Sequence, residues 1–329
     1  MHYIEEDNIG GVILFDYNPQ SQSFDKNIEN PAQVQRLNQQ LQAITHQSNE
    51  RYHRPQIPLL ISVDYEGGKV NRLHPRYGFP AILSAKEIGK MGYEEANNTA
   101  KLMASVLKNS GFNLDFAPVL DVDVNPDNPI IGKLGRSFSA DPNSVTQYGQ
   151  LYSKQFLAQH IECSYKHFPG HGSSITDSHL GFVDITNTWS VSELTPFLQL
   201  LSQTKHCGMV MVAHVVNRNL DASGLPATLS FSMISGLLRH DLQFNGVVIT
   251  DDMQMKAIAD YYGLSTALTL AINAGADMFI FGNQLVDKAQ EPKELIDLIA
   301  EKVQSGEIPE ARIDEAYRRI IQMKSSLKN

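Results

Sequence analysis

The sequence has only two cysteines and no long hydrophobic run, and these absences exclude several classes of protein. Cys163 and Cys207 each lie in or beside an apolar run and show no metal-like spacing, so we expect two buried thiols. No apolar run reaches the ~18 residues of a membrane span, and Met1 to Gly11 has neither the basic start nor the apolar middle of a signal peptide. The sequence predicts no membrane span, no export signal and a cytoplasmic location.

Basic residues are also scarce, and this limits the partners. The net charge is −9 and no run of Lys or Arg occurs, which argues against nucleic acid or an anionic membrane as a partner. A small neutral or amphipathic ligand is the better hypothesis. With 329 residues, 42% of them hydrophobic, the chain can fold as one α/β domain over residues 1–329. We expect a monomer.

Seven short apolar, β-rich runs alternate with segments of helical spacing, which predicts buried parallel strands joined by helices. The runs are Gly11 to Phe15, Leu59 to Asp64, Leu114 to Asp121, Cys163 to Phe168, Gly208 to His214, Gly246 to Asp251 and Met278 to Gly282. Asn30-Pro31 and Asp141-Pro142 place a cap residue before a proline at a helix start, and Ser190 and Glu193 have capping-box spacing.

Ionisable side chains gather at the carboxyl ends of these runs. They are Asp64, Asp121, Lys166 with His167, His214, and Asp251 with Asp252. In a TIM-type (β/α)8 barrel every strand points its carboxyl end at one mouth, whereas a doubly wound sheet gathers such groups only near its switch point. The barrel is therefore the predicted fold. Its first strand is absent or atypical, since no apolar run precedes Gly11.

The segment YKHFPGHGSSITDSH, Tyr165 to His179, contains three histidines. Although His167 and His171 are four residues apart, Pro169 and Gly170 between them prevent the helix that would form a zinc pair, so we expect no metal. Asp177 and His179, two residues apart on a loop, can form a dyad in which the carboxylate orients the imidazole as a general acid/base. The alternative is a surface turn with a solvated histidine.

Asp251 ends a buried strand and is a candidate nucleophile, with helix capping as the alternative. A nucleophilic carboxylate and an acid/base are the groups that a retaining glycosidase needs. Five further residues are candidate substrate contacts, each with a structural alternative such as an ion pair, a surface charge, core packing or a satisfied buried histidine. They are Asp64, Arg136, Lys166, His214 and Met255.

Taken together, the motifs resemble family 3 glycoside hydrolases of the NagZ type, which are bacterial β-N-acetylglucosaminidases. The matching segments are IGGVILF, VDYEGGKVNRL, FAPVLDV, GRSFS, KHFPGHG, DSH, MVAHV, LPATLS, GVVITDDMQM and AGADM, in the family's order. The resemblance implies a barrel with Asp251 as nucleophile and His179, oriented by Asp177, as acid/base. It implies that Asp64, Arg136, Lys166 and His167 hold the N-acetylglucosamine (GlcNAc) hydroxyls and acyl group. Met255 would lie near the N-acetyl pocket.

The resemblance also implies a reaction and its substrates. A retaining exo-β-N-acetylglucosaminidase would remove terminal GlcNAc from muropeptide fragments, as in peptidoglycan recycling, or from chitooligosaccharides, without a cofactor. Because a neutral imidazole does not repel phosphate, a β-N-acetylglucosaminide phosphorylase is the alternative enzyme. An inactive glycan-binding barrel that lost its first strand is the alternative of another class. Relatives usually begin with a strand and helix before IGGVILF, and an earlier start could also carry an export signal.

Overall fold

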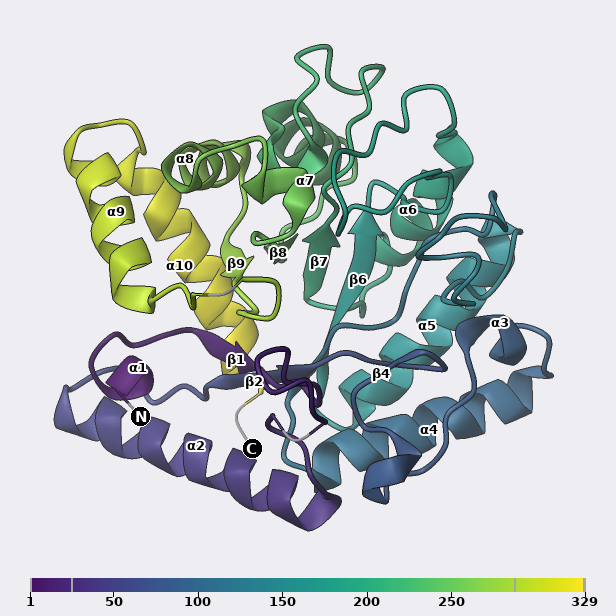
Figure 1. The fold of residues 1–329 in the computed structure, drawn as a ribbon, viewed down its shortest axis with the longest axis horizontal. Coiled ribbons are helices and arrows are strands. Elements are labelled where there is room, and N and C mark those ends of the chain that lie inside the picture. The colour runs from purple at the N-terminus through teal and green to yellow at the C-terminus, as the bar shows by residue number, and fades with distance from the viewer. Residues whose placement is uncertain (1, 25, 287, 328–329) are drawn as a thin grey trace.

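The computed structural model describes residues 2–24, 26–286 and 288–327, and its centre is a curled parallel sheet (Figure 1). The strand order is β1-β2-β5-β6-β7-β8-β9, with every pairing parallel. The strands are β1 (Gly11–Ile13), β2 (Leu60–Val63), β5 (Leu114–Asp115), β6 (Glu162–Phe168), β7 (Met209–Val212), β8 (Val247–Asp252) and β9 (Met278–Ile280). Each predicted apolar run contributes one strand, so the predicted parallel sheet is confirmed.

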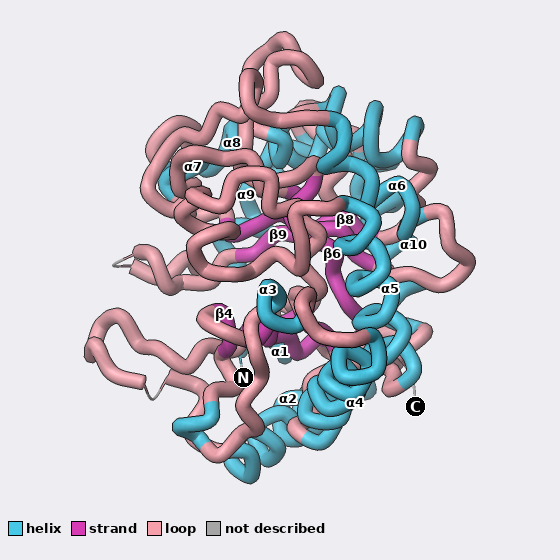
Figure 2. Tube along the Cα trace, turned by 90° about the vertical axis from the view of Figure 1, so that its right-hand side faces the viewer, coloured by secondary structure: helices cyan, strands magenta, loops and turns pink. Residues whose placement is uncertain are grey.

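Helices cover the outer face of this sheet, as Figures 1 and 2 show from two sides. The α-helices are α1 (His2–Glu5), α2 (Pro31–Arg51), α3 (Ala85–Ile88), α4 (Tyr93–Asn109), α5 (Pro142–Ala158), α6 (Thr195–Leu201), α7 (Lys256–Ala259), α8 (Leu264–Ala274), α9 (Pro292–Gln304) and α10 (Glu310–Ser325). Shorter or wider turns form η1 (Pro75–Tyr77), η2 (Val191–Leu194), η3 (Ala227–Leu229) and the π-helix η4 (Ser232–Asp241), and β3 (Tyr65–Gly67) pairs antiparallel with β4 (Val70–Asn71). This is the architecture of a TIM-type α/β barrel.

Two of the three predicted helix starts have the expected caps. Asn30 accepts a hydrogen bond from the amide of Gln33 at 2.9 Å, and Asp141 accepts from the amides at the start of α5. The predicted capping box at Ser190 is wrong, because the Ser190 side chain makes no cap hydrogen bond. Glu193 is instead buried, and its carboxylate accepts a hydrogen bond from the amide of Ser173 at 3.2 Å.

Alternate side chains of each strand enter different cores, as expected for strands whose neighbours point to opposite faces. Ile61 and Val63 of β2 join the large cluster between sheet and helices. Leu60 belongs to the smaller inner cluster, whose buried members are Leu60, Leu114, Phe116, Met209, Met211, Val247, Ile249, Ile280, Met323 and Leu327. Two of these, Met323 and Leu327, come from α10 and the residues after it, so the C-terminal helix helps to fill the barrel.

The described residues include no eighth strand between β1 and β9, in agreement with the sequence. Side chains connect the two edges instead. A Cβ on Gly282 would lie 3.3 Å from the ring of Phe15, and the Lys26 ammonium donates a hydrogen bond to the carbonyl of Asn283 at 3.3 Å. At the other end of β1, the Lys324 ammonium of α10 donates to the carbonyl of Gly10 at 2.8 Å. The seven-stranded sheet is thus closed by loop contacts and by α10.

The prediction of two separate thiols is wrong, because Cys163 and Cys207 form a disulfide. Both residues are buried, as expected, and their Cα atoms are 4.9 Å apart. Cys163 lies on β6 and Cys207 immediately precedes β7, the neighbouring parallel strand. Because 44 residues separate them in sequence, only the strand order brings the two sulfur atoms together.

Among the described residues, no helix combines the length and apolar character needed to cross a membrane.

Candidate active site

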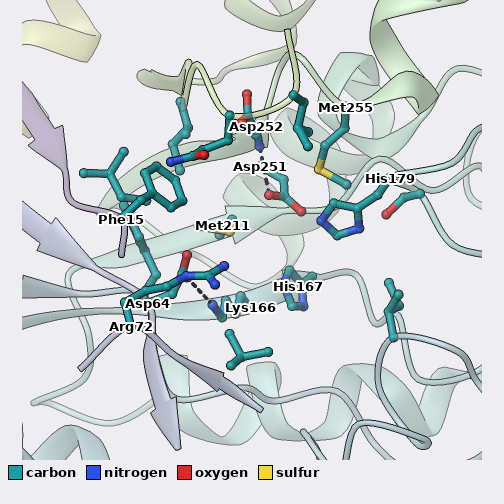
Figure 3. Close-up of a pocket in the computed structure, with 18 of the residues that line it drawn as sticks. Phe15, Asp64, Arg72, Lys166, His167, His179, Met211, Asp251, Asp252 and Met255 are labelled. Carbon is teal, nitrogen blue, oxygen red and sulfur yellow. Dashed lines mark hydrogen bonds and ion pairs between the residues drawn. The ribbon is translucent and has the colours of Figure 1, made fainter. Parts of the chain in front are cut away.

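A cavity of about 390 Å³ opens at the carboxyl ends of the strands (Figure 3). Seven of the residues proposed from the sequence line it or lie on its walls. They are Asp64, Arg136, Lys166, His167, His179, Asp251 and Met255. These side chains come from β6, β8 and the loops that follow β2, β5, β6 and β8, so the curling of the sheet is what brings them together.

Asp251 lies at the end of β8, on the wall of the cavity opposite Lys166 (Figure 3). One oxygen of its carboxylate accepts a hydrogen bond from the amide of Asp252 at 2.8 Å. Burial alone would raise the pKa of Asp251, but the facing histidines, His167 first, hold it well below its usual range. The carboxylate is therefore ionised at neutral pH, which is the form that can attack an electrophilic carbon.

His179 and Asp177 form the predicted dyad. The Nδ1 atom of His179 lies 2.8 Å from a carboxylate oxygen of Asp177, and the same oxygen accepts a hydrogen bond from the His179 amide at 2.8 Å. Because Nδ1 is engaged by the carboxylate, Nε2 remains for proton exchange with a ligand. The ring is 47% exposed and extends toward Asp251 (Figure 3), so the loop combines the dyad contact with the solvated histidine and the capped amide of the alternative.

A network of buried charges forms the wall opposite Asp251. The Lys166 ammonium lies 2.9 Å from Asp64 and 2.6 Å from Glu66. The Arg136 guanidinium donates two hydrogen bonds to Glu66, at 2.8 and 2.7 Å, and its Nη2 is 3.3 Å from Nε2 of His167. Burial alone would raise the pKa of Glu66, but Arg136 and Lys166 lower it to about 2. Glu66 therefore fixes both cations.

His167 and His171 have separate roles that the sequence did not distinguish. Nδ1 of His167 lies 2.6 Å from the buried carboxylate of Asp121, so His167 presents Nε2 to the cavity side. Burial lowers the pKa of His171 to about 4, so its ring is neutral. Its Nδ1 lies 2.6 Å from the hydroxyl of Ser174 and its Nε2 lies 3.3 Å from that of Ser178. His171 therefore holds both ends of the segment that leads to the dyad.

The same contacts bear on the zinc hypothesis. The rings of His167 and His171 are edge to face with centroids 6.0 Å apart, and each has its own hydrogen-bond partners. Over residues 2–24, 26–286 and 288–327, no three His, Cys, Asp or Glu side chains gather as a metal-binding group.

His214 is not among the residues that line the cavity, and its assignment as a substrate contact stays a prediction. It is buried, with Nδ1 2.7 Å from the Thr228 hydroxyl and Nε2 2.9 Å from the carbonyl of Asp252. The structure thus supports the alternative of a satisfied buried histidine behind the nucleophile candidate. Met255 does line the cavity, next to His179.

Phe15, Asp16 and Arg72 are polar or aromatic cavity residues that were not recognised from the sequence. Phe15 and Asp16 follow β1, and Arg72 follows β4 with its guanidinium 5.7 Å from the Phe15 ring centroid and 3.8 Å from Asp16. Phe15 and Arg72 lie on the side of the cavity away from His179 (Figure 3). Both stand inside motifs quoted above, and a polar or aromatic residue just beyond a strand end was the signal that could have identified them.

The fold and the site define a class of protein. It is a barrel in which the Asp251 carboxylate and the Asp177–His179 dyad face a wall of charged side chains. Residues 1–323 match the family described as Glycosyl hydrolase family 3 N terminal domain, and the chain belongs to this family. The family and the TIM-type fold that the sequence motifs indicated are therefore confirmed.

Individual relatives agree with this assignment. The chain is 31% identical to beta-hexosaminidase A of Pseudoalteromonas piscicida, with 97% of this chain and 54% of that protein covered. It is 33% identical to the beta-hexosaminidase LpqI of Mycobacterium tuberculosis, covering 82% of this chain and 68% of that one. A solved family 3 beta-N-acetylglucosaminidase from Paenibacillus sp. FPU-7 matches 99% of this chain with a TM-score of 0.86 and 34% identity, over 58% of its own length. The chain thus spans little more than half the length of two of these relatives.

Proposed function

We propose that this chain is a retaining β-N-acetylglucosaminidase that removes terminal β-linked GlcNAc from muropeptide fragments or chitooligosaccharides. The observation that carries the proposal is the placement of Asp251 and the Asp177–His179 dyad on one cavity, across from the Lys166 and Arg136 cations. The names of the relatives, beta-hexosaminidase and beta-N-acetylglucosaminidase, support the same activity.

The reaction would proceed in two displacements. Asp251 attacks the anomeric carbon while His179 gives its Nε2 proton to the leaving oxygen, and a glycosyl-enzyme of inverted configuration forms. Water then attacks the same carbon, His179 takes its proton, and Asp251 is released, so the overall configuration is retained. Asp177 stabilises the imidazolium that exists before the first proton transfer and again after the second, and it keeps Nδ1 protonated while the ring is neutral between them. The hydroxyl groups of the sugar would be held by Asp64, Lys166 and their neighbours.

The test is hydrolysis of p-nitrophenyl β-N-acetylglucosaminide by the wild type, Asp251→Ala and His179→Ala, with and without phosphate. We expect free GlcNAc as the product, and no activity for Asp251→Ala until azide is added. With Asp251→Ala, azide should take the place of the missing nucleophile and form the α-glycosyl azide. With His179→Ala, azide should attack the glycosyl-enzyme from the opposite face and form the β-glycosyl azide. GlcNAc 1-phosphate as the product would instead identify a phosphorylase. A folded wild type without turnover would identify the glycan-binding barrel.

The disulfide bears on the compartment. Disulfides persist in oxidising compartments and are rare in the cytosol of mesophiles. The Cys163–Cys207 bond therefore favours an oxidising compartment over the cytoplasmic location predicted from the composition. The monomeric state stays a prediction.

A further inference from the structure

Three large apolar side chains are exposed beside the acid/base loop, where packing does not require them. Leu180, which follows His179 directly, is 73% exposed, Phe182 is 39% exposed and Tyr261 is 57% exposed. The rings of Phe182 and Tyr261 lie together, with centroids 5.7 Å apart and an interplanar angle of 53°. We call Leu180, Phe182 and Tyr261 the rim residues.

The rim residues are joined to the cavity from two directions. Phe182 continues the segment that carries the Asp177–His179 dyad. Tyr261 follows α7, which begins directly after Met255, a residue that lines the cavity. The two segments are tied together, because the amide of Ala257 in α7 donates a hydrogen bond to the carbonyl of Ser178 at 3.3 Å. The ring pair therefore connects the two segments that carry the cavity residues His179 and Met255, just outside the cavity lining itself.

The proposed chemistry places a particular group at this rim. The proton of His179 Nε2 must reach the glycosidic oxygen, so that oxygen lies within hydrogen-bond distance of the ring. The sugar that is cleaved off fills the cavity between Asp251 and Lys166, and the leaving group therefore continues outward past His179. A pyranose ring has an apolar face of C–H groups, and aromatic side chains at a wet rim provide large apolar contact area for such a face.

We propose that the rim residues form the leaving-group subsite and bind the apolar face of a second β-linked N-acetylhexosamine. The inference rests on the proposed function and deepens it, because it names the part of the chain that selects a sugar over a smaller leaving group. The same surface would bind a sugar acceptor that intercepts the glycosyl-enzyme. A sugar seated there also covers the Asp177–His179 pair, which is otherwise open to water.

The test compares two substrates that differ in the leaving group alone. One is the GlcNAc-β-1,4-GlcNAc disaccharide and the other is methyl β-N-acetylglucosaminide, whose leaving oxygen needs the same proton but carries no ring. The variants are Phe182→Leu and Tyr261→Leu, which remove a ring and keep an apolar side chain. Tyr93→Leu is the matched control, because Tyr93 is 66% exposed on α4, a helix that contributes no residue to the cavity.

We expect each rim variant to lower kcat/KM for the disaccharide by about tenfold, the upper range for one aromatic contact, while the methyl glycoside changes by less than about twofold. Transfer of GlcNAc to a GlcNAc acceptor should fall in parallel. Equal losses on both substrates would overturn the proposal, since the rings would then merely support the position of His179. An unchanged disaccharide rate would also overturn it. A wild type that cleaves neither substrate would overturn the proposed function itself, and the subsite with it.

Discussion

Glu66 is the residue on which the charged wall of the cavity depends, and its neutralisation gives the sharpest test of the structure. Its carboxylate is buried between Arg136, which donates two hydrogen bonds, and Lys166, 2.6 Å away. The change Glu66→Gln keeps the shape of the side chain and removes its charge. Arg136 would then lose its carboxylate partner and Lys166 would keep only Asp64, so we expect the folded state to lose stability at neutral pH.

The expected loss in the free energy of unfolding can be estimated in two ways. Lowering the pKa of Glu66 from 4.5 to about 2 corresponds to about 3 kcal/mol, because each tenfold change in proton affinity is worth about 1.4 kcal/mol. Removing one partner of a buried ion pair costs about 3 to 5 kcal/mol, which agrees. Since the folded-state pKa is depressed, this stability is present above pH 4.5 and is lost as the pH falls toward 2. The stability of Glu66→Gln should therefore approach that of the wild type as the pH falls toward 2.

Asp115→Asn is the matched control. Asp115 is also a buried carboxyl near this wall, but burial raises its pKa well above the usual value. One of its oxygens accepts a hydrogen bond from the amide of Tyr65 at 3.0 Å, and an asparagine keeps that acceptor. Because neutralising a carboxyl whose ionised form is disfavoured costs little, we expect Asp115→Asn to lose less than about 1 kcal/mol at pH 7.

The assay is urea unfolding at pH 7 and at pH 3, followed by the fluorescence of Trp189, the single tryptophan. At pH 7 we expect the free energies of unfolding of Glu66→Gln and Asp115→Asn to differ by several kcal/mol. At pH 3 this difference should be smaller. Equal losses for the two variants, or a Glu66→Gln loss under about 1 kcal/mol at pH 7, would refute this expectation.

Two further predictions concern the disulfide and the loop that carries the dyad. Replacing Cys163 and Cys207 together by serine should lower stability by about 4 kcal/mol, since the bond closes a loop with a sequence separation of 44 residues; unchanged melting would contradict this. His171→Ala should leave KM of an unactivated GlcNAc glycoside nearly unchanged but lower kcat by about 10- to 100-fold, because the dyad loop loses its hold at Ser174 and Ser178. An unchanged kcat in steady-state kinetics would contradict the role of His171 in positioning the dyad loop.

Much of the fold was predictable because its signals are local. The apolar runs correspond to the strands, and Asn30-Pro31 and Asp141-Pro142 mark the starts of α2 and α5. Strand direction then placed Asp251 and Lys166 at one mouth, since parallel strands direct their carboxyl ends the same way. The DSH triplet predicted the contact between Asp177 and His179, because residues two apart on a loop can meet without help from the rest of the chain.

The tertiary structure alone decided contacts between distant segments. The sequence showed neither that Cys163 meets Cys207, nor that Glu66 joins Lys166 to Arg136, nor that α10 fills the barrel between strands that lack an eighth neighbour. The sequence also predicted a capping box at Ser190, but Glu193 is buried and the Ser190 side chain makes no cap hydrogen bond. The physical reason is common to these cases. Periodicity and capping are fixed by residues a few positions apart, whereas the pairing of buried charges and sulfur atoms depends on which strands become neighbours and in what register.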